Sequence, residues 1–326
     1  MKKHISILTA LLFAGTTTFA QRPSEKINIG LVPPLSSNWT SASKDTNSFS
    51  FNFLAGISAS EMGFAIAGFA NFVRHNADGV LVAGFMNTSG GGKGVEIAGF
   101  GNFAKNNSGT QIAGFANVGG NVSAGQIAGF INVAKNVNGA QISGFINTAK
   151  VVHGIQLAGF INIADTADCQ IGLVNISKNG EISIGATIDE NRTTILSLRS
   201  GGKFLYGIVG MGYNLSDKKD EYAFQAGLGA HIVHAEPFRL NAELTNSSLL
   251  NFKGLTYFKS AFALLPSIRL ADRVELFAGP SLVYVDTNSN DDVVRQKHYI
   301  SSWGGQNGND FHGFYMGYNV GIAIRL

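Results

Sequence analysis

Apolar and polar residues alternate one by one over long stretches of the last third of the chain. In residues 222–232 every second side chain, from Tyr222 to Ile232, is apolar, and the residues between them are Ala, Gln, Gly or His. Residues 238–245 and 314–326 repeat this alternation. A period of two places the apolar side chains of a β-strand on one face and the polar side chains on the other. The pattern therefore predicts long, two-faced strands at the carboxyl end.

Such strands occur both in transmembrane β-barrels and in soluble β-sandwiches, and the connections between them favour the barrel. Short connections at 200–203, 234–237 and 271–273 alternate with longer ones, which are 215–220, 246–254 and 287–312. Outer-membrane barrels have short periplasmic turns and longer external loops. We therefore expect residues 181–326 to form an antiparallel transmembrane β-barrel.

Two further segments before residue 58 have the character of strands. They are residues 26–32 and 48–57, and the polar stretch 33–47 between them is long enough for an external loop. Together with eight strands in 181–326 they give ten, an even number as in bacterial barrels. We therefore assign residues 21–57 to the first barrel strands and the loop, and expect an all-β chain with a barrel of 8–10 strands.

A short phrase repeats through the middle of the chain. Gly, then Phe or once Leu, then any residue, then Asn occurs eight times, and six of the seven intervals are 15 or 16 residues long. The glycines are Gly68, Gly84, Gly99, Gly114, Gly129, Gly144, Gly159 and Gly172, and each Asn follows three residues later. A period this short has room for strands and turns but not for a pair of helices. Residues 58–180 are therefore predicted to be a repeat region.

Two architectures fit this repeat. In a β-solenoid inserted into the barrel, each repeat is one coil, the Asn side chains bond along the stack, and Gly occupies a tight corner. In the alternative, each repeat is one membrane strand, and the chain forms a single barrel of about 18 strands. In a barrel, alternation would place Phe115 on the same side as Gln111 and Asn117, away from lipid. Neighbouring barrel strands also run in opposite directions, so a barrel repeat would comprise two strands, whereas this repeat is complete in 15 residues. We therefore favour the solenoid.

The first 20 residues have the pattern of a secretory signal peptide. Lys2 and Lys3 precede an apolar run at 5–14, and Thr18-Phe19-Ala20 resembles a cleavage site. The run is about half the roughly 20 residues that a spanning helix needs. We expect secretion across the inner membrane and location in the cell outer membrane, where lipid and the barrel-assembly machinery are the expected partners.

Composition excludes several classes of function. The chain has 24 basic and 21 acidic residues, and without Lys2 and Lys3 the basic count is 22. This balance indicates no basic patch and no nucleic-acid partner. A lone Cys169 excludes an internal disulfide and a site with several cysteines, and its expected role is that of a small apolar residue.

No catalytic, cofactor-binding or metal-binding residue is assigned, because the known catalytic and phosphate-binding motifs are missing from the sequence. The nearest constellation is His231, His234 and Glu236, but the two histidines face opposite sides of a strand and cannot share a metal. Asp291 and Asp292 lie in a polar loop. The inward positions Arg239, Glu243, Lys259 and Glu275 could line a polar channel, but we expect them to form a salt-bridged plug, because charges inside narrow barrels need partners.

The phrases QIAGFINVAKNVNG and CQIGLVNISKNG resemble the units of a Gram-negative surface-repeat family of outer-membrane proteins. The resemblance covers about residues 63–180 and implies a surface or outer-membrane location without an established activity. The leading hypothesis is a non-enzymatic outer-membrane barrel that carries a repeat domain for surface or envelope interactions. The alternatives are a porin-like channel with the repeats in its wall and, third, a barrel enzyme.

Overall fold

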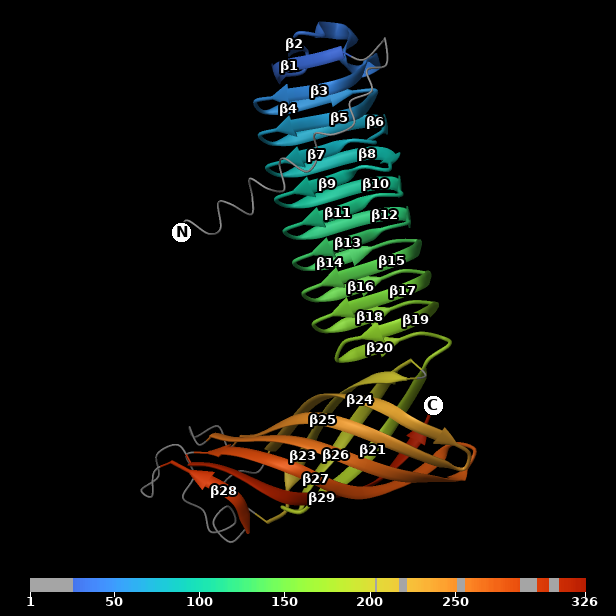
Figure 1. Cartoon of the computed structure of the whole chain (residues 1–326), viewed down its shortest axis with the longest axis vertical. Coiled ribbons are helices and arrows are strands. Elements are labelled where there is room, and N and C mark those ends of the chain that lie inside the picture. Colours follow the sequence, from blue (N-terminus) through green and yellow to red (C-terminus); the bar gives the residue numbers. More distant parts are fainter. Residues whose placement is uncertain (1–25, 203, 217–221, 251–255, 288–297, 305–310) are drawn as a thin grey trace. The chain divides into compact units, whose positions relative to one another are not determined.

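The computed structural model of the chain describes residues 26–202, 204–216, 222–250, 256–287, 298–304 and 311–326 (Figure 1). It consists of two compact units, Met1–Ala128 and Gly129–Leu326. The predicted signal peptide, residues 1–20, lies outside the described residues.

The first unit is a β-solenoid of short strands. Its elements are β1 (Lys26–Val32), β2 (Leu35–Ser36), the 3-10 helix η1 (Trp39–Lys44), β3 (Thr46–Asn52), β4 (Ala55–Ser58), β5 (Ser60–Ala67), β6 (Ala70–Asn76), β7 (Val80–Ala83), β8 (Met86–Gly92), β9 (Val95–Ala98), β10 (Gly101–Asn107), β11 (Thr110–Ala113), β12 (Ala116–Val122) and β13 (Gly125–Ala128). Strands β1, β3, β5, β7, β9, β11 and β13 form one parallel sheet, and β4, β6, β8, β10 and β12 form the other. Each coil contributes one strand to each sheet.

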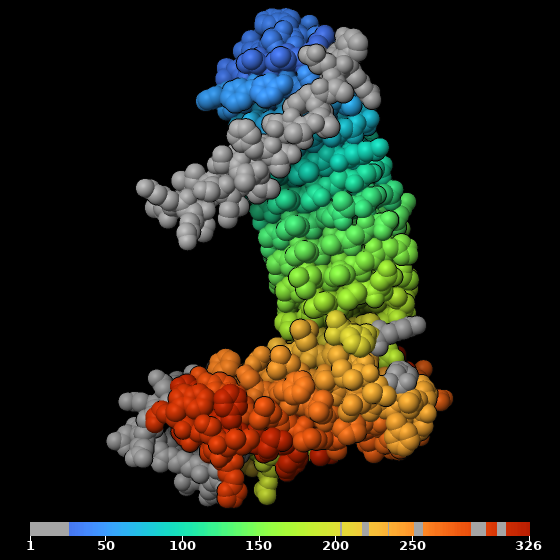
Figure 2. Space-filling view, viewed as in Figure 1, coloured from blue at the N-terminus to red at the C-terminus, as the bar shows by residue number. Residues whose placement is uncertain are grey.

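The coils stack in constant register, as predicted for a solenoid. Asn102 lies opposite Asn87 on one side and Asn117 on the other, and Gln111 lies opposite Glu96 and Gln126. Neighbouring coils of the first unit pack without a visible gap on the face shown in Figure 2. A repeat of constant length therefore brings like residues together, which is the property that the sequence period indicated.

The prediction that residues 21–57 supply barrel strands is wrong. Strand β1 pairs in parallel with β3, and β3 pairs in parallel with β5, so both belong to the solenoid. The expected external loop, 33–47, instead holds β2, which pairs antiparallel with β1, and helix η1. Alternating Phe residues at 49, 51 and 53 are equally compatible with one face of a solenoid sheet, and period two alone could not separate the two settings.

The second unit contains further solenoid coils followed by the barrel. The coils comprise β14 (Ile131–Val133), β15 (Asn136–Ser143), β16 (Ile146–Thr148), β17 (Val151–Ala158), β18 (Ile161–Ile163), β19 (Thr166–Ile171) and β20 (Val174–Ile176). The barrel strands are β21 (Glu181–Asp189), β22 (Thr193–Gly201), β23 (Leu205–Asn214), β24 (Tyr222–Ala235), β25 (Phe238–Leu250), β26 (Thr256–Ala271), β27 (Val274–Thr287) and β29 (Phe311–Arg325), with the short β28 (Tyr299–Trp303) paired to β29.

These eight barrel strands form a closed antiparallel sheet, because β21 pairs with β29. The prediction of an all-β chain with a separate barrel and solenoid is confirmed, and the single barrel of about 18 strands is wrong. The solenoid precedes the barrel and is not inserted between its strands. The sequence alternation is also confirmed: Phe224 and Leu228 are exposed on the outside of β24, whereas Arg239 and Glu243 of β25 are buried inside.

The corner of each coil corrects one detail of the repeat. Gln111 and Asn117 point inward, but Phe115 points outward, because Gly114 and Phe115 form a corner between β11 and β12 and interrupt the alternation. A Cβ atom on Gly114 would lie 2.2 Å from the carbonyl oxygen of Gly99 in the preceding coil. This close approach explains why glycine occupies the corner, as predicted.

Candidate functional site

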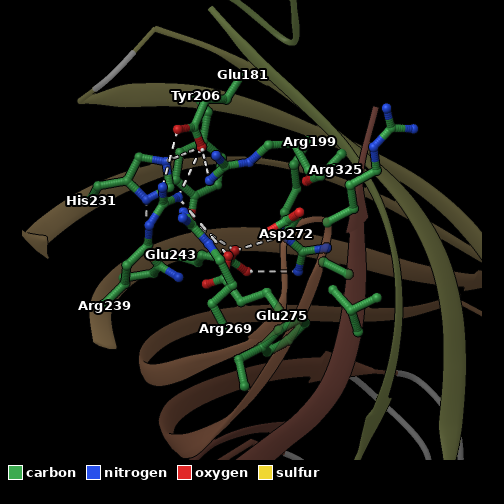
Figure 3. Close-up of a pocket in the computed structure, with 16 residues that line it drawn as sticks. Glu181, Arg199, Tyr206, His231, Arg239, Glu243, Arg269, Asp272, Glu275 and Arg325 are labelled. Atoms are coloured by element: carbon green, nitrogen blue, oxygen red, sulfur yellow. Dashed lines mark hydrogen bonds and ion pairs between the residues drawn. The ribbon is translucent and has the colours of Figure 1, made fainter. Parts of the chain in front are cut away.

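The polar interior of the barrel contains a small cavity at one end (Figure 3). Its volume is about 50 Å³, and charged side chains line most of it. The lining includes Glu181, Arg199, Tyr206, His231, Arg239, Glu243, Arg269, Asp272, Arg273, Glu275 and Arg325. The turn between β26 and β27 and the last residues of β29 contribute to this end of the barrel.

Arg199 and Glu243 form a buried pair inside the barrel. Arg199 Nε donates to Glu243 Oε1 at 2.8 Å, and Arg199 Nη2 donates to Oε2 at 3.2 Å. The hydroxyl of Tyr206 also donates to Glu243 Oε1, at 2.9 Å. The guanidinium of Arg199 lies 5.0 Å from the centre of the Phe277 ring. Two hydrogen bonds to a carboxylate and contact with the face of an aromatic ring together offset the free-energy cost of burying the charge of an arginine.

Glu181 joins two arginines at the mouth of the cavity. Arg239 donates to both of its carboxylate oxygens, at 2.9 and 3.1 Å, and Arg325 Nη2 donates at 3.0 Å. Glu275 lies 3.9 Å from Arg239 and accepts a hydrogen bond from the hydroxyl of Ser267. The strands β21, β25, β27 and β29 are thus connected across the lumen by ionic contacts.

A second ionic cluster lies farther along the lumen. Lys259 Nζ donates to Asp189 Oδ2 at 2.8 Å and to Glu190 Oε1 at 2.6 Å. The hydroxyl of Tyr315 donates to the same Glu190 oxygen at 2.8 Å. The three charged side chains are no more than 10% exposed. Each cation of the lumen that these clusters contain is therefore matched by at least one carboxylate.

The predicted salt-bridged plug is confirmed for Arg239, Glu243, Lys259 and Glu275. Sequence reasoning missed their partners Glu181, Asp189, Glu190, Arg199 and Tyr206. Arg199 could have been found, because it follows the inward positions Ile195 and Ser197 in alternation. Asp189 and Glu190 had the appearance of turn residues, and nothing in the sequence indicated that this turn folds over the lumen.

The constellation of His231, His234 and Glu236 is described only in part, and among the described residues no group of three metal-ligating side chains occurs. His231 points inward as predicted: its Nδ1 lies 2.6 Å from Asn241 Oδ1, and its ring packs 4.7 Å from that of Tyr206. The side chain of His234, and Asp291 and Asp292, lie outside the described residues. Glu236 forms an ion pair with Arg269.

The solenoid interior is also polar, but its side chains are neutral amides. Asn87 Nδ2 donates to Asn102 Oδ1, and Asn102 Nδ2 donates to Asn117 Oδ1, each at 2.9 Å. In the second unit, Asn132, Asn147, Asn162 and Asn175 continue the same arrangement with distances of 2.9 to 3.0 Å. Within the ladder Asn87, Asn102, Asn132, Asn147 and Asn162 each donate to the Asn of the next coil, and Asn175 ends it. The predicted Asn ladder is therefore confirmed.

A glutamine ladder runs in the opposite direction. Gln126 Nε2 donates to Gln111 Oε1 at 2.9 Å, and Gln111 Nε2 donates to Glu96 Oε2 at 2.8 Å. Glu96 ends this ladder in the first unit and also accepts from the hydroxyl of Ser89. Burial raises the pKa of Glu96 above its ordinary value, although these two hydrogen bonds oppose the shift. Burial raises the pKa of Glu61 in the same way.

The last solenoid coil contacts the barrel within the second unit. The backbone N–H of Asn175 donates to Ser200 Oγ at 2.9 Å, and Asn175 Nδ2 donates to the Ser200 carbonyl oxygen at 3.2 Å. Ser200 belongs to β22. The side chain that ends the Asn ladder thus bonds to a barrel strand, so the open end of the ladder is satisfied by the barrel.

Comparison with protein-family models, curated proteins and solved structures found no match. Among the described residues no helix has the length and apolar character to cross a bilayer.

The thiol of Cys169 is half-buried on the outside of the solenoid. Burial is the main cause that raises its pKa, and the negative charge of the nearby Asp168 raises the pKa further.

Proposed function

We propose that the chain is a non-enzymatic outer-membrane β-barrel protein whose barrel anchors the solenoid for interactions with envelope or surface partners. The observation that carries this proposal is the inverted polarity of the barrel. Large apolar side chains cover its outside, whereas its inside holds clusters of paired charges beside buried apolar side chains such as Ile195, Val283 and Leu265. The exposed outward residues include Leu196, Met211, Phe224, Leu228, Leu244, Phe262, Leu282, Met316, Val320 and Ile322. Lipid hydrocarbon is the environment that suits such an exterior.

The ion-paired lumen favours an anchor over a pore. Arg199 with Glu243, and Lys259 with Asp189 and Glu190, bridge strands on different sides of the lumen. Eight-stranded barrels have interiors just wide enough for their own side chains. The porin-like alternative required the repeats to enlarge the wall, and the repeats form a separate solenoid. The resemblance to the surface-repeat family agrees with the anchor hypothesis, and membership stays a prediction.

The connections of the barrel suggest on which side of the membrane the repeats lie. The last coil bonds to Ser200, at the end of the barrel where the connections are the short segments 202–204, Glu236-Pro237 and Asp272-Arg273. The other end has the connections 190–192, 215–221, 251–255 and 288–310, of which only 190–192 is as short as three residues. In outer-membrane barrels the short turns face the periplasm. We therefore place the repeats on the periplasmic side, where envelope components are the accessible partners.

Planar-bilayer recording tests the anchor function. The purified full-length protein should give no large, steady single-channel currents, because paired side chains occupy the lumen. A variant with Arg199→Ala and Glu243→Ala serves as an internal comparison, since removal of two bulky side chains should increase any residual leak. Large steady currents from the unmodified protein would refute the anchor and support the channel.

Cysteine labelling of intact cells tests the sidedness separately. In a Cys169→Ser background, Ser216→Cys lies within the long connection 215–221, and Lys150→Cys lies in an exposed turn of the solenoid. A membrane-impermeant maleimide should label the first variant in intact cells and the second only after the outer membrane is permeabilised. Labelling of Lys150→Cys in intact cells would place the repeats on the outside.

A further inference from the structure

One outer surface of the solenoid in the first unit is apolar and regular. It consists of the outward side chains of β5, β7, β9, β11 and β13 together with the corner phenylalanines, and we call it the apolar face. Ile97, Ile112 and Ile127 are 37 to 42% exposed. Phe69, Phe85, Phe100 and Phe115 form a stack at its edge, with ring centres 4.8 to 5.0 Å apart. These rows are large side chains in solvent, not core residues.

Charge is segregated away from this face. In the described strands that form it, the acidic residues Glu61 and Glu96 point inward, and no outward side chain is charged. The exposed cations Arg74 and Lys105 belong to β6 and β10 in the opposite sheet. Monomeric soluble proteins rarely expose contiguous apolar patches beyond a few hundred Å². An uncharged face of this regularity indicates a surface that is covered by a partner.

We propose that the apolar face docks against the same face of a second copy of this chain. Its rows of Ile and Phe repeat at about 4.8 Å, the spacing of hydrogen-bonded strands. Side chains of two stacked sheets interdigitate when both surfaces have matching rows. A second copy supplies the same spacing over the whole length, whereas an unrelated globular surface has no such period. A face without charges also meets its own copy without like-charge repulsion.

The area fits a modest homodimer. Five strands from β5 to β13 at about 4.8 Å and a width of about 17 Å, five residue steps, give about 400 Å² of projected area per copy. Two copies then bury about 800 Å² of flat area, and more when side-chain relief is included, which is in the range of weak, transient interfaces. In the second unit, Ile142 of β15 and Leu157 of β17, with the corner residues Phe145 and Phe160, have the same outward pattern. A twofold axis makes such an interface self-complementary.

Disulfide crosslinking of two differently tagged full-length copies in one cell tests the proposal without detergent. In a Cys169→Ser background, Ile112→Cys places a thiol on the apolar face, and the matched control Lys105→Cys places one on the opposite sheet. Mild oxidation of cell envelopes should give a dimer that contains both tags for Ile112→Cys and at least tenfold less for Lys105→Cys. Formation of the crosslinked dimer requires neither a membrane-inserted barrel nor a closed lumen. A negative result would therefore contradict the dimer without contradicting the outer-membrane anchor.

A pair of charge variants gives an independent measurement. Ile97→Lys combined with Ile112→Lys should abolish co-purification of the two tags, while Lys105→Glu should leave it unchanged, and circular dichroism should show the same strand content in both. Equal crosslinking at both cysteine positions, crosslinking to a protein without either tag, or co-purification that survives the double lysine variant would each overturn the proposal.

Discussion

The solenoid and the barrel both enclose polar side chains, but the chemical type of these side chains differs between them. The solenoid interior holds neutral amides such as Asn102 and Gln111, and the barrel interior holds opposite charges such as Arg199 and Glu243. In a solenoid each inward residue faces a copy of itself in the next coil. An amide can bond to its own copy because it both donates and accepts, whereas a charged group would repel its copy.

The barrel has no such restriction, because residues that face each other across its lumen come from different strands with different sequences. Arg239 can therefore meet Glu181, and Lys259 can meet Asp189. Glu96 is informative as an exception, since it stands where the Gln ladder ends in the first unit and accepts from Gln111 without having to donate onward. The repetition of identical coils in the solenoid therefore favours side chains that can bond to their own copies. The barrel strands do not repeat in this way, so ion pairs can form between them.

The largest effect is expected when one half of a barrel ion pair is removed. Glu243→Leu should lower the free energy of unfolding by about 3–5 kcal/mol, because Arg199 is left buried without a counter-charge. The double variant Arg199→Leu with Glu243→Leu should recover most of the loss. Urea unfolding of the detergent-solubilised protein, followed by gel mobility of the folded barrel, measures both. A double variant no more stable than the single one would show that the charges are not coupled.

An intermediate effect is expected when the Asn ladder is interrupted by a group that cannot donate. Asn102→Asp keeps the shape of the side chain but removes the donor to Asn117 Oδ1 and to the Ile112 carbonyl oxygen. Loss of buried hydrogen bonds costs about 1–3 kcal/mol. The exposed Asn106→Asp is the control and should change stability little. If circular dichroism during urea unfolding shows equal effects, the self-bonding explanation of the ladder is wrong.

The smallest effect concerns the charge at Glu96. Its pKa is raised in the folded state, so the folded protein prefers the protonated form, and stability should rise as the pH falls through that raised pKa toward the unfolded value of about 4.3. Glu96→Gln should stabilise the protein at pH 7 and lose this advantage at lower pH. Asp168→Asn, an exposed carboxylate in the same solenoid, is the control. A stability difference between wild type and Glu96→Gln that is independent of pH would contradict the assignment.

The sequence predicted regular features and failed where regularity ended. The 15-residue period was sufficient to infer stacked coils and the Asn ladder, and strict alternation identified the inward charges of β25. The outward position of Phe115 was missed, because the prediction assumed that alternation continues past Gly114, where the chain in fact turns a corner. The segment before residue 58 was assigned to the barrel, because its alternating Phe residues have no repeat phrase to mark them as solenoid. The partners Asp189 and Glu190 depend on the path of one turn, which local pattern does not determine.

The inverted polarity of the barrel is the central claim, and sedimentation of the mature, full-length protein in buffer without detergent tests it most directly. The account predicts that the protein aggregates there and becomes monodisperse when detergent or lipid covers the exterior residues such as Phe224 and Leu244. Discrete, stable particles in plain buffer, with the barrel folded and no bound surfactant, would contradict the membrane anchor.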